Sequence, residues 1–434
     1  MRNRITFLIV LAVLLVAVSV SAGPNAGKSL TRTQDPLILE GAPLAGLTGW
    51  PIAATRAFAM KNGTVSAIPF QIDEKRPDGQ YALPSGPQIS ADDGMIDAND
   101  ELVFMAMDAG DRIGRDQLPA GFTAAVELEI TDPIDGGKGW VYLASYAQNP
   151  PPLSAIDYVT YNNANVVIDT LWFRMAFHPK ARLSIGDLIR KPAGGGGNRD
   201  LVDRLKIRFT GSVFGVDLDR NEENFLSETL GWIDGPVRIV RRTVNRVTLW
   251  KLKSPKAFTD NVYYINAFEF PTIIELPFRS DLIVKNPKFR ISTDGMCNVS
   301  GRRFYNSNNP NGVSIDGVMD AAEKSLDTGP YTWSLVTDPG GQGGWMNRLL
   351  YDTRATPVRP NLYYNDNAGV ADGPEDELGE CGDIGYTLDN LGQLKKDKMY
   401  LKSILYSVPG TDAKTISEFL NIIDKPLRVN VRAL

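Results

Sequence analysis

Short runs of apolar or alternating residues, separated by glycine and proline every eight to twelve residues, make up most of this chain. This spacing is typical of an all-β sandwich or barrel, and residues that repeat with the helical period are scarce. The sequence therefore predicts an all-β protein, with a large antiparallel β-sandwich and few short helices. The expected strands are Val65–Ile72, Glu101–Met107, Ala124–Thr131, Gly139–Tyr146, Val166–Phe173, Leu205–Phe214, Pro236–Leu252, Asn261–Leu276, Tyr331–Val336, Met399–Val408 and Pro426–Ala433.

Two of the apolar runs are unusually long. Val237–Leu249 and Val262–Leu276 both exceed the usual strand length of about 5 or 6 residues, as strands of large curved sheets do. The first run contains Arg241, Arg242 and Arg246, and its alternation is expected to place cationic and apolar groups on opposite faces. Two interpretations stay open: an arginine-lined concave face, or a solvated convex face that its basic residues protect.

Composition divides the chain into two expected domains. Residues 23–40 are small, polar and without pattern, which indicates a flexible leader. The prolines that follow Asn149 break both helices and ladders, so we expect an N-terminal β-domain over residues 41–148 and a large sandwich over residues 149–434. One helix is expected over Ala413–Ile423, where apolar residues recur at helical spacing behind a cap at Asp412.

The first 22 residues have the pattern of a secretory signal peptide. Arg2 and Arg4 precede the apolar run Ile5–Val18, which ends in small residues. No later run approaches the roughly 20 apolar residues that a membrane span needs. The sequence therefore predicts a periplasmic or secreted protein whose mature chain has no membrane span.

Charge and cysteine content narrow the possible partners and chemistry. The formal net charge is -5, and the basic residues are scattered rather than clustered, which argues against nucleic acid as a partner. Cys297 and Cys381 are the two cysteines, and an even pair in an exported chain predicts a disulfide. Neither lies in a CxxC motif, which excludes covalent c-type haem and thioredoxin-like chemistry.

Two segments share the pattern D-G-x-φ-D-A-x-[D/E], in which φ is apolar. This is the second half of an EF-hand-type loop, where a glycine turn follows one oxygen ligand and a carboxylate completes the calcium sphere. The first halves do not match, and an Asp-Gly turn between strands is the alternative. The predicted Ca²⁺ ligands are Asp93, Asp97 and Asp100 in the first segment, and Asp316, Asp320 and Glu323 in the second.

Two further acidic segments are candidate cation sites. Asp217, Asp219 and Asn221, with Glu228 further on, match the early ligand positions of a calcium loop, although Glu222 stands where glycine normally permits the turn. A denser acidic segment is either a cation site or an exposed loop, and crowded repulsive charges favour the exposed loop. It contains Asp366, Asp372, Glu375, Asp376, Glu377, Glu380 and Asp383.

His178 is the single histidine, which excludes a multi-histidine zinc or haem site. It is a candidate general base beside Arg174, Lys180 or Arg182, because proton abstraction from a uronate needs a base and a cation that stabilises the enolate. An ordinary histidine at a strand end is the alternative. The chain contains neither GxSxG nor a phosphate-cradling loop.

Three segments, Ile68–Glu74, Asp97–Ala106 and Gly235–Arg241, resemble a little-characterised family of exported bacterial β-sandwich proteins. The first is also similar to the small β-domain that precedes catalytic domains in some secreted polysaccharide-degrading proteins. Such proteins often carry a large sandwich of the galactose-mutarotase type, so the resemblance implies a supersandwich-like fold for the larger domain. The chain lacks the His/Tyr clusters and the downstream catalytic domain of their active members, so the resemblance implies carbohydrate binding rather than catalysis.

The leading functional hypothesis is an exported, non-catalytic protein that binds carbohydrate or another envelope polymer, with calcium-stabilised loops. A polysaccharide lyase and a structural component of the cell envelope are the alternatives. Flat aromatic rings near strand ends and glycine loops could face sugar rings, although most are expected in the core. They are Trp172, Trp232, Trp250, Trp333, Trp345, Tyr363 and Tyr364.

Overall fold

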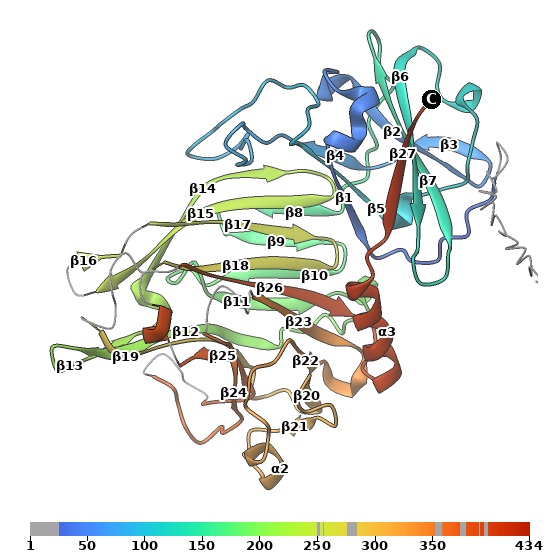
Figure 1. The fold of residues 1–434 in the computed structure, drawn as a ribbon. Coiled ribbons are helices and arrows are strands. Elements are labelled where there is room, and N and C mark those ends of the chain that lie inside the picture. The colour runs from blue at the N-terminus through green and yellow to red at the C-terminus, as the bar shows by residue number, and fades with distance from the viewer. Residues whose placement is uncertain are drawn as a thin grey trace, which may run out of the picture.

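A computed structural model describes residues 26–249, 252–254, 256–275, 284–351, 358–373, 379–389, 391–394 and 398–434 (Figure 1). The expected signal peptide, residues 1–22, lies outside the described residues. Within the described part, the helices are too short or too polar to cross a bilayer. The expectation of an all-β protein is confirmed, since the chain is built from antiparallel sheets.

Two sheets pack face to face to form the N-terminal domain (Figure 1). One has the order β1-β5-β4 and the other the order β27-β6-β7-β2-β3. Their core contains buried aliphatic side chains such as Leu102, Leu128 and Leu143. The strands are β1 Pro36–Glu40, β2 Thr55–Lys61, β3 Thr64–Ala67, β4 Phe70–Asp73, β5 Glu101–Met105, β6 Phe122–Thr131, β7 Lys138–Tyr146 and β27 Arg428–Ala433.

A ten-stranded sheet forms one layer of the larger unit, in the order β14-β15-β17-β18-β26-β23-β22-β20-β21, and β16 pairs with the end of β15. Its strands are β14 Phe225–Asp234, β15 Arg238–Leu249, β16 Leu252–Lys253, β17 Ala257–Tyr264, β18 Ala267–Glu275, β20 Arg302–Asn306, β21 Val313–Ile315, β22 Trp333–Thr337, β23 Gly344–Tyr351 and β26 Lys398–Val408.

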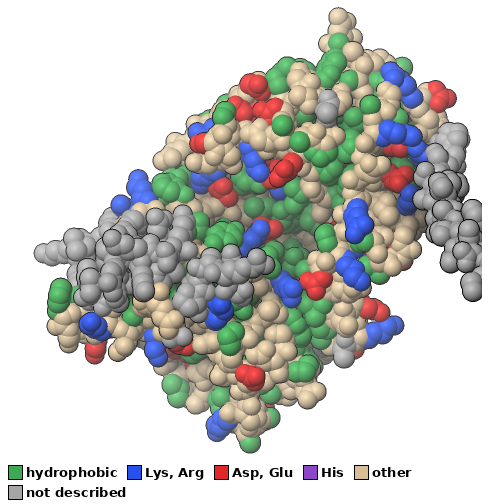
Figure 2. All heavy atoms as spheres, in the orientation of Figure 1, with side chains coloured by type: hydrophobic (Ala, Val, Ile, Leu, Met, Phe, Trp, Pro, Cys, Tyr) green, Lys and Arg blue, Asp and Glu red, His purple; other side chains and the backbone are tan. Residues whose placement is uncertain are grey.

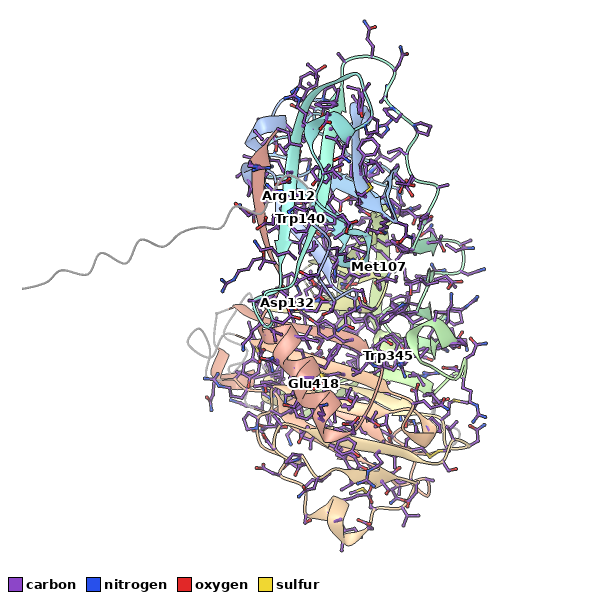
Figure 3. The ribbon with its side chains drawn as sticks, turned by 90° about the vertical axis from the view of Figure 1, so that its right-hand side faces the viewer. Met107, Arg112, Asp132, Trp140, Trp345 and Glu418 are labelled. Atoms are coloured by element: carbon purple, nitrogen blue, oxygen red, sulfur yellow. A yellow bond between two sulfur atoms is a disulfide. The ribbon has the colours of Figure 1, made fainter. Side chains whose placement is uncertain are left out.

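The second layer consists of two smaller sheets, of orders β11-β10-β9-β8 and β13-β12-β19-β25-β24. Both pack on the same side of the ten-stranded sheet, and Figure 3 places Trp345 within this sandwich, where it packs edge-on against Phe173. The strands are β8 Val159–Asn162, β9 Val167–Thr170, β10 Phe173–Phe177, β11 Ile185–Arg190, β12 Val202–Val213, β13 Val216–Arg220, β19 Val284–Gly295, β24 Asn361–Asn365 and β25 Asp383–Leu388.

The helix expected near the C-terminus is confirmed as α3, Ala413–Asp424. The Asp412 carboxylate caps it by accepting hydrogen bonds from the Lys414 and Thr415 N–H groups. Ile416 and Phe419 pack on the ten-stranded sheet, so α3 covers one end of its outer face. A second helix, α2 Ala321–Lys324, was not expected.

The expectation of a flexible leader over residues 23–40 is wrong for residues 26–40, because they are packed into the N-terminal domain. Leu30 is buried, and β1 pairs with β5. Arg32 donates a hydrogen bond to Asp132 at 3.3 Å and another to the Lys425 carbonyl at 2.8 Å (Figure 3 shows Asp132 at the lower edge of this domain). These ties order a segment whose composition alone looks like a linker.

The last strand lies in a different domain from the one that the boundary near residue 148 implies. β27 pairs with β6 over the register Arg428–Thr131 to Ala433–Val126, so the chain end completes the N-terminal sheet. The N-terminal domain is therefore built from both ends of the chain. A single boundary in the sequence cannot describe such a domain, because strands that are far apart in sequence can pair antiparallel.

Three expected strands are each two strands in the structure. Val65–Ile72 divides at Pro69, which cannot donate to a ladder. Val166–Phe173 turns after Thr170, whose hydroxyl oxygen accepts hydrogen bonds from the N–H groups of Trp172 and Phe173. Asn261–Leu276 turns between β17 and β18, and Leu276 lies outside the described residues. Apolar periodicity marks the strands but not tight turns that lack glycine.

Arg241 and Arg242 of β15 fit neither interpretation, while Arg246 is partly exposed. Arg238, Arg241 and Arg242 are all buried, at 1%, 1% and 7% exposure. Arg238 and Arg242 share a face with Val240, while Arg241 lies on the opposite face with Ile239. Each face is thus mixed, and the arginines are covered by acidic or aromatic partners rather than by solvent.

Candidate functional site

The first Asp-Gly segment forms a turn whose carboxylates accept backbone hydrogen bonds. Asp93 and Asp97 each accept from the N–H two residues later, at 2.8 and 3.1 Å. Asp100 is buried, and its two oxygens accept from the N–H groups of Lys75 and Asp97, both at 3.0 Å. Among the described residues, the oxygens of these three aspartates do not converge as a ligand set. Calcium binding here stays a prediction.

Replacing Asp100 with alanine is expected to lower the free energy of unfolding by about 2 kcal/mol, because two backbone N–H groups lose their acceptor in a buried turn. Asp93→Ala, which removes an exposed carboxylate, is the matched control and should change it by less than about 0.5 kcal/mol. Urea unfolding with calcium and with chelator measures both. A loss for Asp100→Ala that shrinks in chelator would instead indicate a calcium ion at this turn.

The second Asp-Gly segment is the start of helix α2. Asp320 is the N-cap: its Oδ1 accepts from the Glu323 N–H at 2.9 Å, and Glu323 Oε2 accepts from the Asp320 N–H at 2.7 Å. The Tyr364 hydroxyl donates to the other Glu323 oxygen at 2.6 Å. Asp316 accepts from a nearby N–H. The pattern D-A-x-E is therefore a capping box in this segment, which explains the spacing without an ion.

The third predicted set lies partly in a strand. Asp217 and Asp219 are exposed residues of β13, paired with β12, so they do not form the turn of a calcium loop. Asn221 precedes a single 3-10 turn, and Glu228 is exposed on β14. Glu222, which was noted for occupying the glycine position, is fully buried and pairs with Arg204 and Arg208. The structure does not bring the four predicted ligands together as a cluster.

The structure places His178 and Arg174 in different surroundings. His178 Nε2 lies 3.4 Å from Arg204, and burial together with the Arg204 charge lowers the pKa of the imidazole. Arg174 is exposed on β10 and lines a surface pocket with Asp169 and Asn162. His178 and Arg174 are therefore not paired as base and cation in this arrangement.

The predicted disulfide is present between Cys297 and Cys381, whose Cα atoms are 5.0 Å apart. Cys297 follows β19, and Cys381 precedes β25, so the bond joins the ends of two neighbouring strands. It ties down the acidic segment that was expected to be exposed. The expectation of an exposed loop is wrong for Asp366, Glu380 and Asp383, which are fully buried. Residues 375–377 lie outside the described residues.

One side of the ten-stranded sheet is open over β17, β18, β26 and β23. Tyr263 and Phe268 pack against the second layer, so the residues that alternate with them point to the other side. Figure 1 shows no described element crossing these strands on that side, and Figure 2 shows the surface hollowed there. We call it the open face. It is formed by Phe258, Asp260, Val262, Glu269, Pro271, Ile273, Arg348, Leu350, Tyr400, Lys402 and Ile404.

The open face combines exposed apolar side chains with ion pairs. Phe258 is 52% exposed, Tyr400 50% and Leu350 42%. Lys402 pairs with Glu269 across the β18–β26 ladder. Such a mixture differs from a solvated sheet face, where large apolar side chains are kept scattered.

Further ion pairs fix charged side chains at both margins of the open face. Arg242 donates two hydrogen bonds to Asp260, both at 2.7 Å, and a third to Gln80 of the N-terminal domain at 3.0 Å. Arg348 reaches Asp424 of α3 at 3.0 Å. The N-terminal domain and α3 therefore bound the open face on two sides.

One buried arginine joins the N-terminal domain to the ten-stranded sheet, beside backbone hydrogen bonds to Gln71 and an apolar contact of Val103 with Val237. Arg238 of β15 donates to Asp73 at 2.7 Å and to Glu101 at 2.5 Å, and Tyr81 donates to the same Glu101 oxygen at 2.7 Å. Burial raises the pKa of Glu101, but the Arg238 charge and hydrogen bonds from Lys75, Arg238 and Tyr81 outweigh it and lower the pKa to about 2. We call this cluster the domain joint.

Sequence reasoning missed the aromatic residues of the open face. Among the aromatics proposed to face sugars, Trp345 is a core residue at 9% exposure, Trp232 packs on Tyr161, and Trp250 lies outside the described residues. Tyr400 lies within the expected strand Met399–Val408, whereas Phe258 precedes the expected strand Asn261–Leu276 and belongs to β17. Which face is open depends on the neighbouring layers.

Comparisons with known proteins give weak similarities. No protein-family model matches the chain, and a search of curated proteins gave no match. An alpha-mannosidase from Enterococcus faecalis V583 is 13% identical with a TM-score of 0.41, covering 94% of this chain and 45% of that chain. A protein in the Glycosyl Hydrolase Family 38 from Enterococcus faecalis is 11% identical with a TM-score of 0.37, covering 94% and 48%.

A third solved structure is a proposed aldose 1-epimerase from Klebsiella pneumoniae, 13% identical with a TM-score of 0.35, covering 60% of this chain and 83% of that chain. The three similar structures are therefore of proteins whose descriptions concern carbohydrates. The chain spans about half the length of the two Enterococcus proteins. At TM-scores below 0.5 these similarities say nothing about the activity of this chain.

Proposed function

We propose that this is an exported, non-catalytic protein that binds carbohydrate or another envelope polymer along the open face. The observation that carries the proposal is the pairing of exposed Tyr400 and Phe258 with fixed charges on an uncovered sheet surface. Sugar rings present apolar C–H faces that stack on aromatic rings, and hydroxyl groups that bond to charged side chains. A sheet face several strands wide can contact consecutive units of a polymer.

The charges favour a neutral polymer over a polyanionic one. The cations at the open face, Arg242, Arg348 and Lys402, are matched by Asp260, Asp424 and Glu269. No excess of positive charge is left to attract a uronate chain among these described residues. Asp260 and Glu269 are the two carboxylates on the open face itself, and each is paired with a cation. Neither is therefore placed as a free general acid or base, which supports binding without catalysis.

Replacing Tyr400 with alanine is expected to weaken polysaccharide binding about tenfold, because an aromatic stacking contact is worth roughly 1 to 1.5 kcal/mol. Phe258→Ala should have a similar effect. Phe214→Ala is the matched control, since Phe214 is 88% exposed but lies on the turn between β12 and β13, away from the open face. Glycan arrays identify the polymer, and titration calorimetry then measures the dissociation constants.

Two outcomes would contradict the proposal. One is the absence of binding to every polysaccharide class, in which case a stable protein partner in a pull-down would favour the structural alternative. The other is an unchanged affinity in the Tyr400→Ala, Phe258→Ala double variant. Release of an unsaturated, ultraviolet-absorbing product from uronate polymers would overturn the non-catalytic part and favour the lyase.

A further inference from the structure

Charged side chains line the outer side of the five-stranded sheet, where β12, β19 and β25 are neighbours. Ile207, Ile291 and Ile384 point into the sandwich core, so the adjacent residues of these strands point outward. Asp383, at the start of β25, is fully buried on this outer side. Asp372 and Glu380 reach the same place from the chain before β25.

The cations of this cluster already have acidic partners. Lys206 Nζ lies 2.8 Å from Asp294 Oδ2 and 3.2 Å from Glu380 Oε1. Arg208 pairs with Glu222 and Asp372.

Arg290 stands directly opposite Arg208 in the β12–β19 ladder, and Asp372 bridges the two guanidinium groups. Without Asp372, these like charges would repel across the ladder. Each cation is therefore already paired, and the acids of the cluster outnumber the cations.

Asp383 is the acid that this arrangement leaves without a hydrogen-bond donor. Both of its carboxylate oxygens are buried and accept no hydrogen bond, and its ion pair with Arg290 spans 3.9 Å. Glu380 Oε2 is buried and accepts none either. A buried carboxylate that no donor or cation satisfies is strongly unfavourable in the folded state. The unpartnered oxygens therefore indicate a missing positive partner.

The geometry of the three acids suits one metal ion. One oxygen each from Asp372, Glu380 and Asp383 lie within 4.8 Å of one another. Calcium takes six to eight oxygen ligands at about 2.3–2.6 Å, so ligands on opposite sides of the ion are about 5 Å apart. Carboxylates without histidine or thiolate ligands favour calcium or magnesium over zinc.

We propose that Asp372, Glu380 and Asp383 bind one divalent cation, calcium in preference to magnesium, on the outer side of the five-stranded sheet. Glu380 bridges Lys206 through Oε1 and the ion through Oε2. The ion fixes the chain on either side of Cys381 against β19 and β25. The site is distinct from the Asp-Gly turns and from the open face, so it stands whether or not the protein binds carbohydrate.

Calorimetric titration of calcium chloride into the chelator-treated full chain tests the proposal. We expect saturable binding of one ion per chain, weaker with magnesium, and a melting temperature higher by about 3–5 °C when free calcium is 100 times the dissociation constant. Asp383→Asn and Glu380→Gln keep the side-chain shapes and should lose at least 90% of the affinity. Both relieve charge repulsion, so they should fold without calcium at least as stably as the wild type.

Asp97→Ala is the matched control, because it removes a carboxylate from the first Asp-Gly turn and should leave calcium binding unchanged. Absence of saturable binding and of a shift in melting temperature would overturn the proposal. It would indicate instead that Glu380 and Asp383 share a proton, which neutralises one of the two carboxylates. Retained affinity in both isosteric variants would overturn it equally. So would affinity lost in Asp97→Ala alone.

Discussion

Replacing Arg238 with alanine is expected to lower the free energy of unfolding by about 3–5 kcal/mol, because it leaves the buried carboxylates of the domain joint without their cation. Arg238 is 1% exposed and binds both Asp73 and Glu101, which come from two strands of the N-terminal domain. Its loss should also loosen that domain from the ten-stranded sheet. Urea unfolding monitored by tryptophan fluorescence measures the change.

The matched control is Arg76→Ala, which breaks a half-exposed ion pair with Asp78 and should cost less than about 1 kcal/mol. Acid titration gives a second readout. The pKa of Glu101 is lowered to about 2 in the folded state, so its stabilising contribution is present above the unfolded pKa of about 4.3 and is lost as pH falls from there toward 2. The wild type should lose stability over this interval more steeply than Arg238→Ala. Equal slopes, or a loss no larger than that of the control, would show that the joint is not held by Arg238.

Reducing the disulfide is expected to lower the free energy of unfolding by about 4 kcal/mol, because the bond closes a loop of 84 residues and so restricts the unfolded chain. The measurement compares urea unfolding with and without dithiothreitol. The Cys297→Ser, Cys381→Ser double variant should show the same loss and no response to the reductant. A wild-type midpoint that dithiothreitol leaves in place would contradict the expectation.

The stabilisation by Arg238 and the stabilisation by the disulfide have different physical origins, and two experiments separate them. The disulfide acts on the entropy of the unfolded chain, so its effect should change little between pH 7 and pH 4. The domain joint acts through charge in the folded state and should weaken with acid. Combining Arg238→Ala with reduction should give nearly additive losses, because the two sites lie in different sheets and share no described contact.

Local pattern was enough to predict the parts of the fold that local physics controls. Alternating apolar and acidic residues mark β6, and a continuous apolar run marks β7, which is buried on both faces. The helix α3 follows from its apolar spacing and from Asp412, whose carboxylate satisfies the first N–H groups. The disulfide followed from counting cysteines in a chain that is expected to be exported.

The candidate sites show where local pattern stops being informative. The same D-G-x-φ-D-A-x-[D/E] spacing is a backbone-bonded turn at Asp100 and a capping box at Asp320. Both uses place carboxylates near backbone N–H groups, as a calcium loop also does. Sequence spacing cannot distinguish them, because the difference is whether the oxygens point toward the backbone or toward one another.

By itself, the sequence determined the all-β class, the cysteine pair and the C-terminal helix, because these depend on periods of two and 3.6 residues and on composition. Only the tertiary structure decided which sheet takes β27, which arginines are buried and which face stays open. Arg238 meets Glu101 across 137 residues of sequence, and Lys206 meets Glu380 across 174. Such pairs form because strands that are distant in the chain become neighbours in a sheet, and no local sequence pattern predicts which distant strands do so.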